Sequence, residues 1–167
     1  MEQSKLDRLM TAMIEYYNGD PKRIQHFIKV HSLCRMIGIG EKLDDVTQFT
    51  LEAAGLVHDI GIRAAEKKYG YSNGKLQETE GPQPAEDMLY RLGFSPEIRK
   101  RVCWLVAHHH TYDKVEGMDY RILLEADFLV NLYEEHAQTP AILAAYDNIF
   151  RTETGKYICK TMFGFSD

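Results

Sequence analysis

Seven histidines occur in the 167-residue chain, and one of them stands directly before an acid, in the pair His58-Asp59. The pair follows the apolar stretch 53–57, which is typical of a tightly buried helix end. Burying an imidazole and a carboxylate costs free energy unless something compensates them. A metal ion would do so, because both groups are ordinary ligands of zinc, manganese and iron. The dipeptide alone, however, is more simply explained by a helix-capping Asp59 beside a core histidine.

Two residues elsewhere in the chain add to this pair. His26 lies on a helix that is expected to precede the one ending at His58. Asp127 stands in a late apolar helix that has no other reason to bury an acid. A helical histidine, then His-Asp, then a distant aspartate after an alanine is a far more specific pattern than the dipeptide.

This order of residues resembles the HD-domain superfamily of metal-dependent phosphohydrolases. The resemblance runs from His26 to Asp127 and implies a metal site formed by four residues: His26, His58, Asp59 and Asp127. It also implies one or two divalent ions per chain, of manganese, iron, nickel, zinc, cobalt or magnesium. Asp59 would bind the metal and hold the attacking water, which makes it the predicted catalytic residue.

The choice of His26 as the first ligand has a competitor in His31. Family members often carry an arginine three residues before this ligand and a valine four residues after it, as Arg23 and Val30 stand to His26. His31 lies five residues further along the helix and would point about 140° away from His26. His26 is therefore the predicted ligand.

Some branches of the superfamily bind a second metal through two more histidines. The run at 108–110 offers the second of them, with His109 preferred, His108 next and His110 the weakest candidate. Glu80 stands where the first is expected, and its carboxylate would favour a harder ion. The histidine run could instead be a solvated helix end, and Glu80 a solvated loop acid.

A positive charge for the substrate phosphate is also expected near the pair. Many relatives have a lysine after His-Asp-Ile-Gly, where this chain has Ile62 followed by Arg63. Arg63 could replace that lysine, as could Lys67 or Lys68, although all three could be ordinary surface charges.

The predicted function is therefore a metal-dependent phosphohydrolase acting on a small phosphorylated substrate, with a nucleotide as the first candidate. The departures at Glu80 and Ile62 keep open a catalytically silent regulatory module that binds metal or ligand. A di-iron oxygenase of the HD type is a further alternative. A helical protein without a metal would require every part of the motif to be coincidence.

Hydrophobic periodicity predicts that helices position these residues in an all-α bundle of the HD-domain type. Helices are expected over residues 6–17, 21–37, 44–57, 84–92, 96–109, 120–135 and 140–150. The stretch 63–83 has little periodicity and is expected to form a long loop that shapes the binding site. Residues 154–163 are expected to fold back as a short tail. One domain is predicted over residues 1–167, with its motif core at about 21–135.

The composition of the chain limits the kinds of molecule that it is expected to bind. The net charge is −5 and Lys and Arg do not cluster, so no nucleic-acid polymer is expected to bind. Three separated cysteines without a CxxC pair indicate neither a disulfide framework nor a thiolate zinc site. No apolar run is long enough for a signal peptide or a membrane span, so we expect a cytoplasmic protein without a membrane partner. The helical hairpins could pair two copies into a homodimer.

Overall fold

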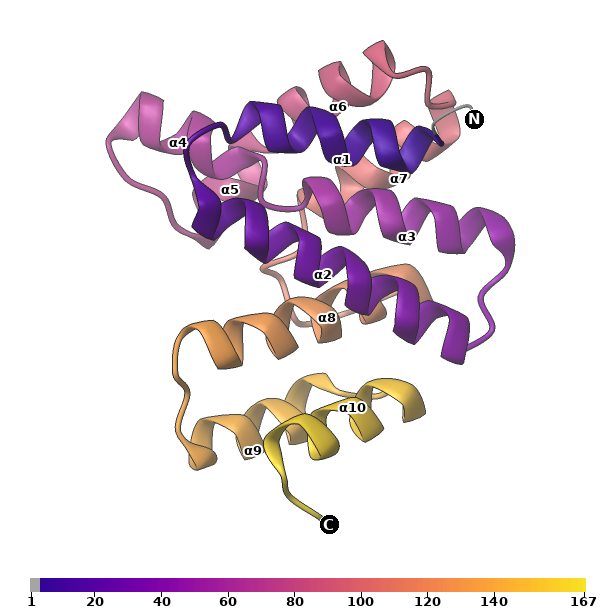
Figure 1. Cartoon of the computed structure of the whole chain (residues 1–167), viewed down its shortest axis with the longest axis vertical. Coiled ribbons are helices and arrows are strands. Elements are labelled where there is room, and N and C mark those ends of the chain that lie inside the picture. Colours follow the sequence, from indigo (N-terminus) through magenta and orange to yellow (C-terminus); the bar gives the residue numbers. More distant parts are fainter. Residues whose placement is uncertain (1–3) are drawn as a thin grey trace.

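The computed structural model describes residues 4–167, and helices are the regular secondary structure of this part of the chain, which confirms the all-α prediction (Figure 1). The ten helices described are α1 (Lys5–Tyr16), α2 (Pro21–Gly40), α3 (Asp45–Val57), α4 (Gly61–Tyr69), α5 (Gly74–Glu80), α6 (Pro82–Arg91), α7 (Pro96–Val106), α8 (Met118–Glu134), α9 (Thr139–Ile149) and α10 (Glu153–Phe163). Within the described residues, none of them is long and apolar enough to cross a membrane.

Capping side chains fix where many of these helices begin. Six residues each accept a hydrogen bond from the backbone amide three residues later, namely Ser4, Asp20, Asp44, Asn73, Ser95 and Thr152. Such a bond satisfies one of the amide groups that the first turn of a helix leaves free. Polar residues that looked like simple breaks in the sequence therefore set the starts of the helices.

Helix α2 lies between α3 and α8 at the centre of the molecule and packs most extensively against these two (Figure 1). Helix α3 is buried on all sides over its second half, residues 50–57, because α1, α2, α7 and α8 surround it. Gly55 allows α2 to come close, since a Cβ there would lie 3.2 Å from Cys34 Sγ and 3.3 Å from His31 Cα. The residues that follow α3 are thereby delivered into the interior.

The predicted loop at 63–83 is wrong, because this stretch contains α4 and α5 and the start of α6. Helix α4 ends at Gly70, which has a left-handed conformation with φ of 81°. Only Gly61 and Ala65 are buried in α4, and no residue of α5 is. These helices are short, and the turn-forming residues Gly70, Ser72 and Asn73 stand between them, which is why the stretch resembled a loop.

Two further boundaries differ from expectation. The predicted tail at 154–163 is helix α10, which Thr152 caps and which packs against α8, α9 and α2. Helix α7 ends at Val106 rather than at residue 109. The histidine run at 108–110 therefore lies on the turn after the helix and not on a helix face.

A buried acid, Glu125, joins α8 to the start of α10. Its Oε1 atom accepts hydrogen bonds from Thr152 Oγ1 (3.0 Å) and from the backbone amides of Arg151 and Thr152 (3.3 Å each). Its Oε2 atom is buried without a partner. Burial raises the pKa of Glu125 to about 7, and these hydrogen bonds offset the effect only in part.

This raised pKa predicts a specific pH dependence of stability. The folded chain holds a proton on Glu125 up to about pH 7, whereas the unfolded chain releases it near 4.5, so stability falls as pH rises through this window. Glu125→Gln removes the titration. We expect the free energy of unfolding of the wild type to fall, relative to that of Glu125→Gln, by up to about 3 kcal/mol between pH 5 and pH 8. Denaturant unfolding at both pH values measures this. The exposed acid Glu153, changed to Gln, is the control, and an equal difference at the two pH values would contradict the expectation.

Candidate metal centre

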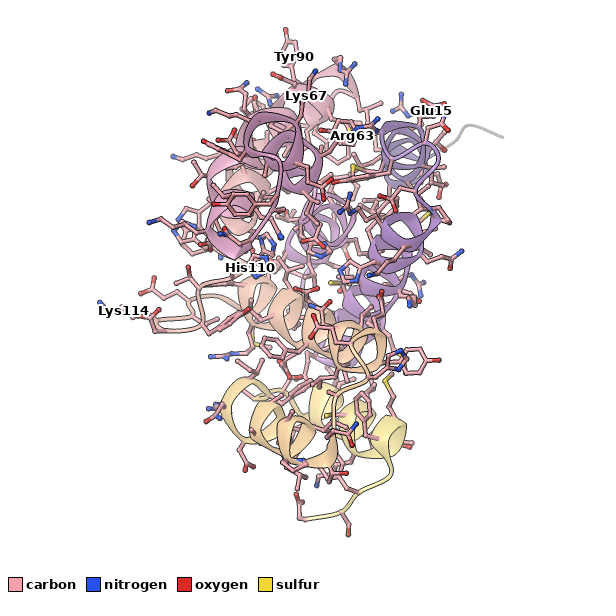
Figure 2. All side chains as sticks on the ribbon, turned by 90° about the vertical axis from the view of Figure 1, so that its left-hand side faces the viewer. Glu15, Arg63, Lys67, Tyr90, His110 and Lys114 are labelled. Atoms are coloured by element: carbon pink, nitrogen blue, oxygen red, sulfur yellow. The ribbon has the colours of Figure 1, made fainter. Side chains whose placement is uncertain are left out.

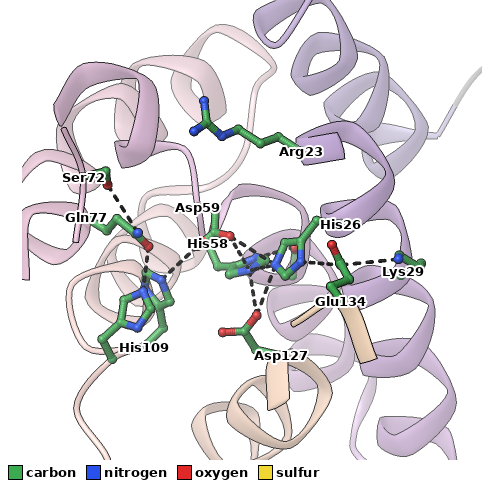
Figure 3. A network of polar contacts seen from close by, with 12 residues as sticks. Arg23, His26, Lys29, His58, Asp59, Ser72, Gln77, His109, Asp127 and Glu134 are labelled. Carbon is green, nitrogen blue, oxygen red and sulfur yellow. Dashed lines mark hydrogen bonds and ion pairs between the residues drawn. The ribbon is translucent and has the colours of Figure 1, made fainter. Parts of the chain in front are cut away.

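The three central helices bring the four predicted ligands together (Figure 3). His26 comes from α2, and Asp127 from α8. His58 and Asp59 follow directly after the last residue of α3, on the turn that leads into α4. The His58 and Asp127 side chains are almost fully buried, and those of His26 and Asp59 are 10% and 20% exposed. The chain thus places four polar side chains in its core at the point where α2, α3 and α8 meet.

Five separations among the four predicted ligand atoms are compatible with one metal ion, and the ligand atoms of His26, His58 and Asp59 all lie within 4.8 Å of one another. His26 Nε2 lies 3.2 Å from His58 Nε2 and 3.1 Å from Asp59 Oδ2. It lies 3.2 Å from Asp127 Oδ1, and His58 Nε2 is 3.4 Å from each of the same two carboxylate oxygens. Ligands about 2.1 Å from an ion lie about 3.0 Å apart in octahedral geometry and about 3.4 Å apart in tetrahedral geometry. The observed separations fall in this range.

The hydrogen bonds of two histidines turn their lone pairs toward the centre. His58 Nδ1 donates to the Gly55 carbonyl at 2.8 Å, and His109 Nδ1 donates to the Val106 carbonyl at 2.7 Å. A carbonyl only accepts, so in neutral imidazole the Nε2 atom is also an acceptor. In both residues this second nitrogen faces a carboxylate oxygen, as His109 Nε2 does at 3.2 Å from Asp59 Oδ1. Acceptors that face one another in a buried site need a cation between them.

The electrostatics of the cluster support the same conclusion. Burial lowers the pKa of His26, but hydrogen bonds to Asp127 and Asp59 outweigh this and raise it to about 10. The same carboxylates hold the pKa of His58 well above its usual range despite its burial. Asp127 Oδ1 is buried and lies against His26 Nε2 at 3.2 Å and His58 Nε2 at 3.4 Å. The two carboxylates thus favour positive charge at both histidines, and a divalent ion could supply that charge in place of protons.

A second group of possible ligands lies on the other side of Asp59. Ligand atoms of Asp59, His109 and His110 are all within 4.8 Å of one another. Gln77 extends from α5 to the same place, with its Oε1 atom 2.6 Å from His110 Nε2. Asp59 therefore faces both groups, with Oδ2 toward His26 and His58 and Oδ1 toward His109.

Two residues predicted for a second metal are not part of this group. Glu80 Oε1 is bound by Lys68 Nζ at 3.1 Å and by the Tyr69 hydroxyl at 3.0 Å, so its carboxylate faces α4. His108 Nδ1 donates to the Trp104 carbonyl at 2.7 Å, and its ring stacks on the Trp104 indole. The early end of α7 explains the difference, because the turn after Val106 directs His109 and the lower-ranked His110 to the site.

An open cavity of about 400 Å³ lies over the metal centre. It is lined by Tyr17, Asp20, Lys22, Arg23, His26, Phe27, Asp59, Ile62, Gln77, His110, Asp127, Asn131, Glu134 and Glu135. Arg63, the predicted phosphate ligand, does not line it, and Figure 2 shows Arg63 well apart from His110. Its guanidinium donates to the Tyr16 carbonyl and lies over the Tyr16 ring.

The basic residues of this cavity come instead from the first turn of α2. Lys22 is exposed at its rim, and Arg23 is held by Asp20 (3.1 Å) and Glu66 (3.1 Å). Sequence reasoning missed Lys22, because no motif marks it. It also missed Glu134, whose Oε1 lies 2.9 Å from His26 Nδ1. The seven-residue spacing from Asp127, two helical turns on one face of α8, is the signal that could have found it.

Comparison with known proteins agrees with this geometry. The family model for the HD domain matches residues 23–146. The matched segment contains all four central ligands and the histidine run at 108–110. Neither a curated protein nor a solved structure matches the chain significantly.

The two competing histidines of α2 allow a direct test. His31 Nε2 lies 3.2 Å from Glu52 Oε1, away from the cluster. We expect His26→Ala to lower bound metal at least about tenfold, because it removes a ligand. His31→Ala should keep its metal but lose about 1–2 kcal/mol of stability, since the largely buried Glu52 loses a partner. Metal analysis after dialysis and denaturant unfolding measure both effects. Metal loss in His31→Ala with retention in His26→Ala would move the first ligand.

Proposed function

This chain belongs to the HD-domain family of metal-dependent phosphohydrolases, and on that premise we propose that it hydrolyses a small phosphate monoester with a bound divalent ion. The observation that carries the proposal is the convergence of the ligand atoms of His26, His58 and Asp59 within 4.8 Å of one another, with Asp127 Oδ1 3.2 and 3.4 Å from the two histidine Nε2 atoms. Carboxylate and imidazole ligands together suit manganese, iron, cobalt, nickel or zinc. These ions all activate water and phosphoryl groups.

Each protein group has a defined part in this chemistry. When bound, the ion supplies Lewis acidity, which makes water more acidic and withdraws charge from the phosphoryl oxygens. Asp59 would hold the ion through Oδ2, the oxygen that faces His26, and its carboxylate lines the cavity, where it would orient the attacking water. His26, His58 and Asp127 complete the ligand set. Lys22 takes the part predicted for Arg63 and attracts the substrate phosphate from the cavity rim.

The charges around the cavity favour one phosphate over several. Three acids that are not central ligands line it, Asp20, Glu134 and Glu135, against two basic residues, Lys22 and Arg23. A single phosphate can be neutralised by the ion, whereas the additional charges of a polyphosphate would face carboxylates. The volume of about 400 Å³ fits a small organic phosphate. A nucleoside monophosphate is the first substrate to test.

A second ion is proposed at Asp59, His109 and His110, with the Gln77 amide oxygen beside it. This group shares its only carboxylate with the first ion and has no other negative charge. The second ion should therefore bind more weakly than the first.

Phosphate release from a panel of monophosphates, with manganese, nickel, cobalt, zinc and iron in turn, tests the function. We expect turnover in the wild type and a loss of at least about a hundredfold in Asp59→Ala, which lacks both the ligand and the group that orients water. Asp113→Asn, an exposed aspartate of the loop before α8, is the control for a lost charge. Full turnover in Asp59→Ala would refute this role. Metal binding without turnover would indicate a silent module, and oxygen consumption with two bound irons an oxygenase.

The second ion is tested by the stoichiometry of manganese. We expect two classes of site in the wild type, and loss of the weaker class in His110→Ala, because His110 contributes only to the second group. His108→Ala should retain both classes, since its ring is stacked on Trp104. Isothermal titration measures both. A single class in the wild type, or loss of the weaker class in His108→Ala, would contradict the assignment.

A further inference from the structure

We propose that Glu134 is a positioning residue of the metal centre, a role that rests on the proposed metal binding. Its carboxylate holds the His26 ring in the tautomer and orientation that place Nε2 at the ion. The contact is direct, because Glu134 Oε1 lies 2.9 Å from His26 Nδ1 (Figure 3). A carboxylate only accepts hydrogen bonds, so the Nδ1 atom carries the hydrogen and the Nε2 lone pair is left for metal.

The register of α8 makes this arrangement possible. Asp127 and Glu134 are seven residues apart, so they lie within about 20° on one face of the helix and about 10 Å apart along its axis. His26 enters between them from α2, the helix that packs against this face. Its Nε2 atom is 3.2 Å from Asp127 Oδ1, while its Nδ1 atom contacts Glu134. One helix thus clamps both nitrogens of a single imidazole.

The hydrogen-bond acceptor at Nδ1 of His26 differs from those of the other histidines of the site. His58 and His109 donate from Nδ1 to the neutral backbone carbonyls of Gly55 and Val106. Among these three, only His26 donates from Nδ1 to a carboxylate. Hydrogen bonds to an ionised acceptor are stronger than those to a neutral one, and they increase the basicity of the opposite ring nitrogen. His26 should therefore be the most strongly donating imidazole of the centre.

Lys29 contacts the same carboxylate oxygen from the solvent side. Its Nζ atom lies 3.3 Å from Glu134 Oε1, and Lys29 stands three residues after His26 on α2. The Lys29 side chain is 41% exposed, against 16% for Glu134. An ion pair of this exposure contributes little to stability on its own. If Glu134 served only to stabilise the fold through its ion pair, replacing Lys29 would have the same effect as replacing Glu134. Variants of the two residues therefore distinguish a structural role from a positioning role.

The test is the cobalt affinity of the full chain, measured by titration calorimetry and by the visible absorption of bound cobalt. Glu134→Gln keeps an acceptor but loses the charge, and we expect affinity to fall about threefold to tenfold. Glu134→Leu also loses the acceptor, and we expect a fall of about ten- to a hundredfold. Lys29→Met and Glu135→Gln are the controls, and both should stay within about twofold of the wild type. Glu135→Gln removes a neighbouring cavity charge that does not contact His26.

Four results would overturn the proposal. Wild-type affinity in both Glu134 variants would exclude a role in metal binding. If Glu135→Gln lost as much cobalt affinity, the general negative charge of the cavity would be responsible. If Lys29→Met lost as much, the ion pair between Lys29 and Glu134 would be responsible. Absence of cobalt binding in the wild type would refute the proposed metal centre as well. Cobalt binding without phosphate release would refute only the hydrolase and leave the role of Glu134 intact. Unfolding midpoints without metal establish that each variant is folded, and Glu134→Gln serves if Glu134→Leu is not.

Discussion

One electrostatic constraint governs the structure: imidazole nitrogens and carboxylate oxygens, all hydrogen-bond acceptors, lie together in the buried candidate metal centre. The backbone carbonyl of Gly55 and the carboxylate of Glu134 occupy the Nδ1 atoms of His58 and His26, so both Nε2 lone pairs point inward. Carboxylate oxygens of Asp59 and Asp127 meet them there. Only positive charge makes such a cluster stable in a protein interior, as protons or as a metal ion. The central helices satisfy this constraint.

The packing around the cluster explains its rigidity. Helix α3 is enclosed by four other helices over residues 50–57, which leaves the turn after it little freedom to move. The opposite wall is less constrained, since α4 and α5 bury few residues and reach the site through Gln77 and its contact to His110. The first group of predicted ligands is thus built on the core, whereas the second group is completed on one side by a surface helix through Gln77.

Much of the central site could be predicted from the sequence, and much of its surroundings could not. His26, His58, Asp59 and Asp127 were predicted because a known motif fixes their order along the chain, and the structure brings them together. Glu80 and Arg63 were assigned from their places in that motif, but contacts with Lys68 and Tyr16 direct their side chains elsewhere. Lys22, Gln77 and Glu134 have no motif, and only the packing of α2, α5 and α8 brings them to the cavity. Contacts between helices that are distant in the sequence place these three side chains in the cavity, and local sequence patterns cannot predict such contacts.

Gly55 contributes both to helix packing and to the orientation of His58. Its missing side chain lets α2 approach α3 near Cys34, and its carbonyl accepts the hydrogen bond that orients His58. A larger residue would push the two helices apart and would move that carbonyl with the backbone. The core and the metal centre are therefore coupled through a single peptide unit. A change of core packing at that crossing would also move the carbonyl that orients the His58 ring.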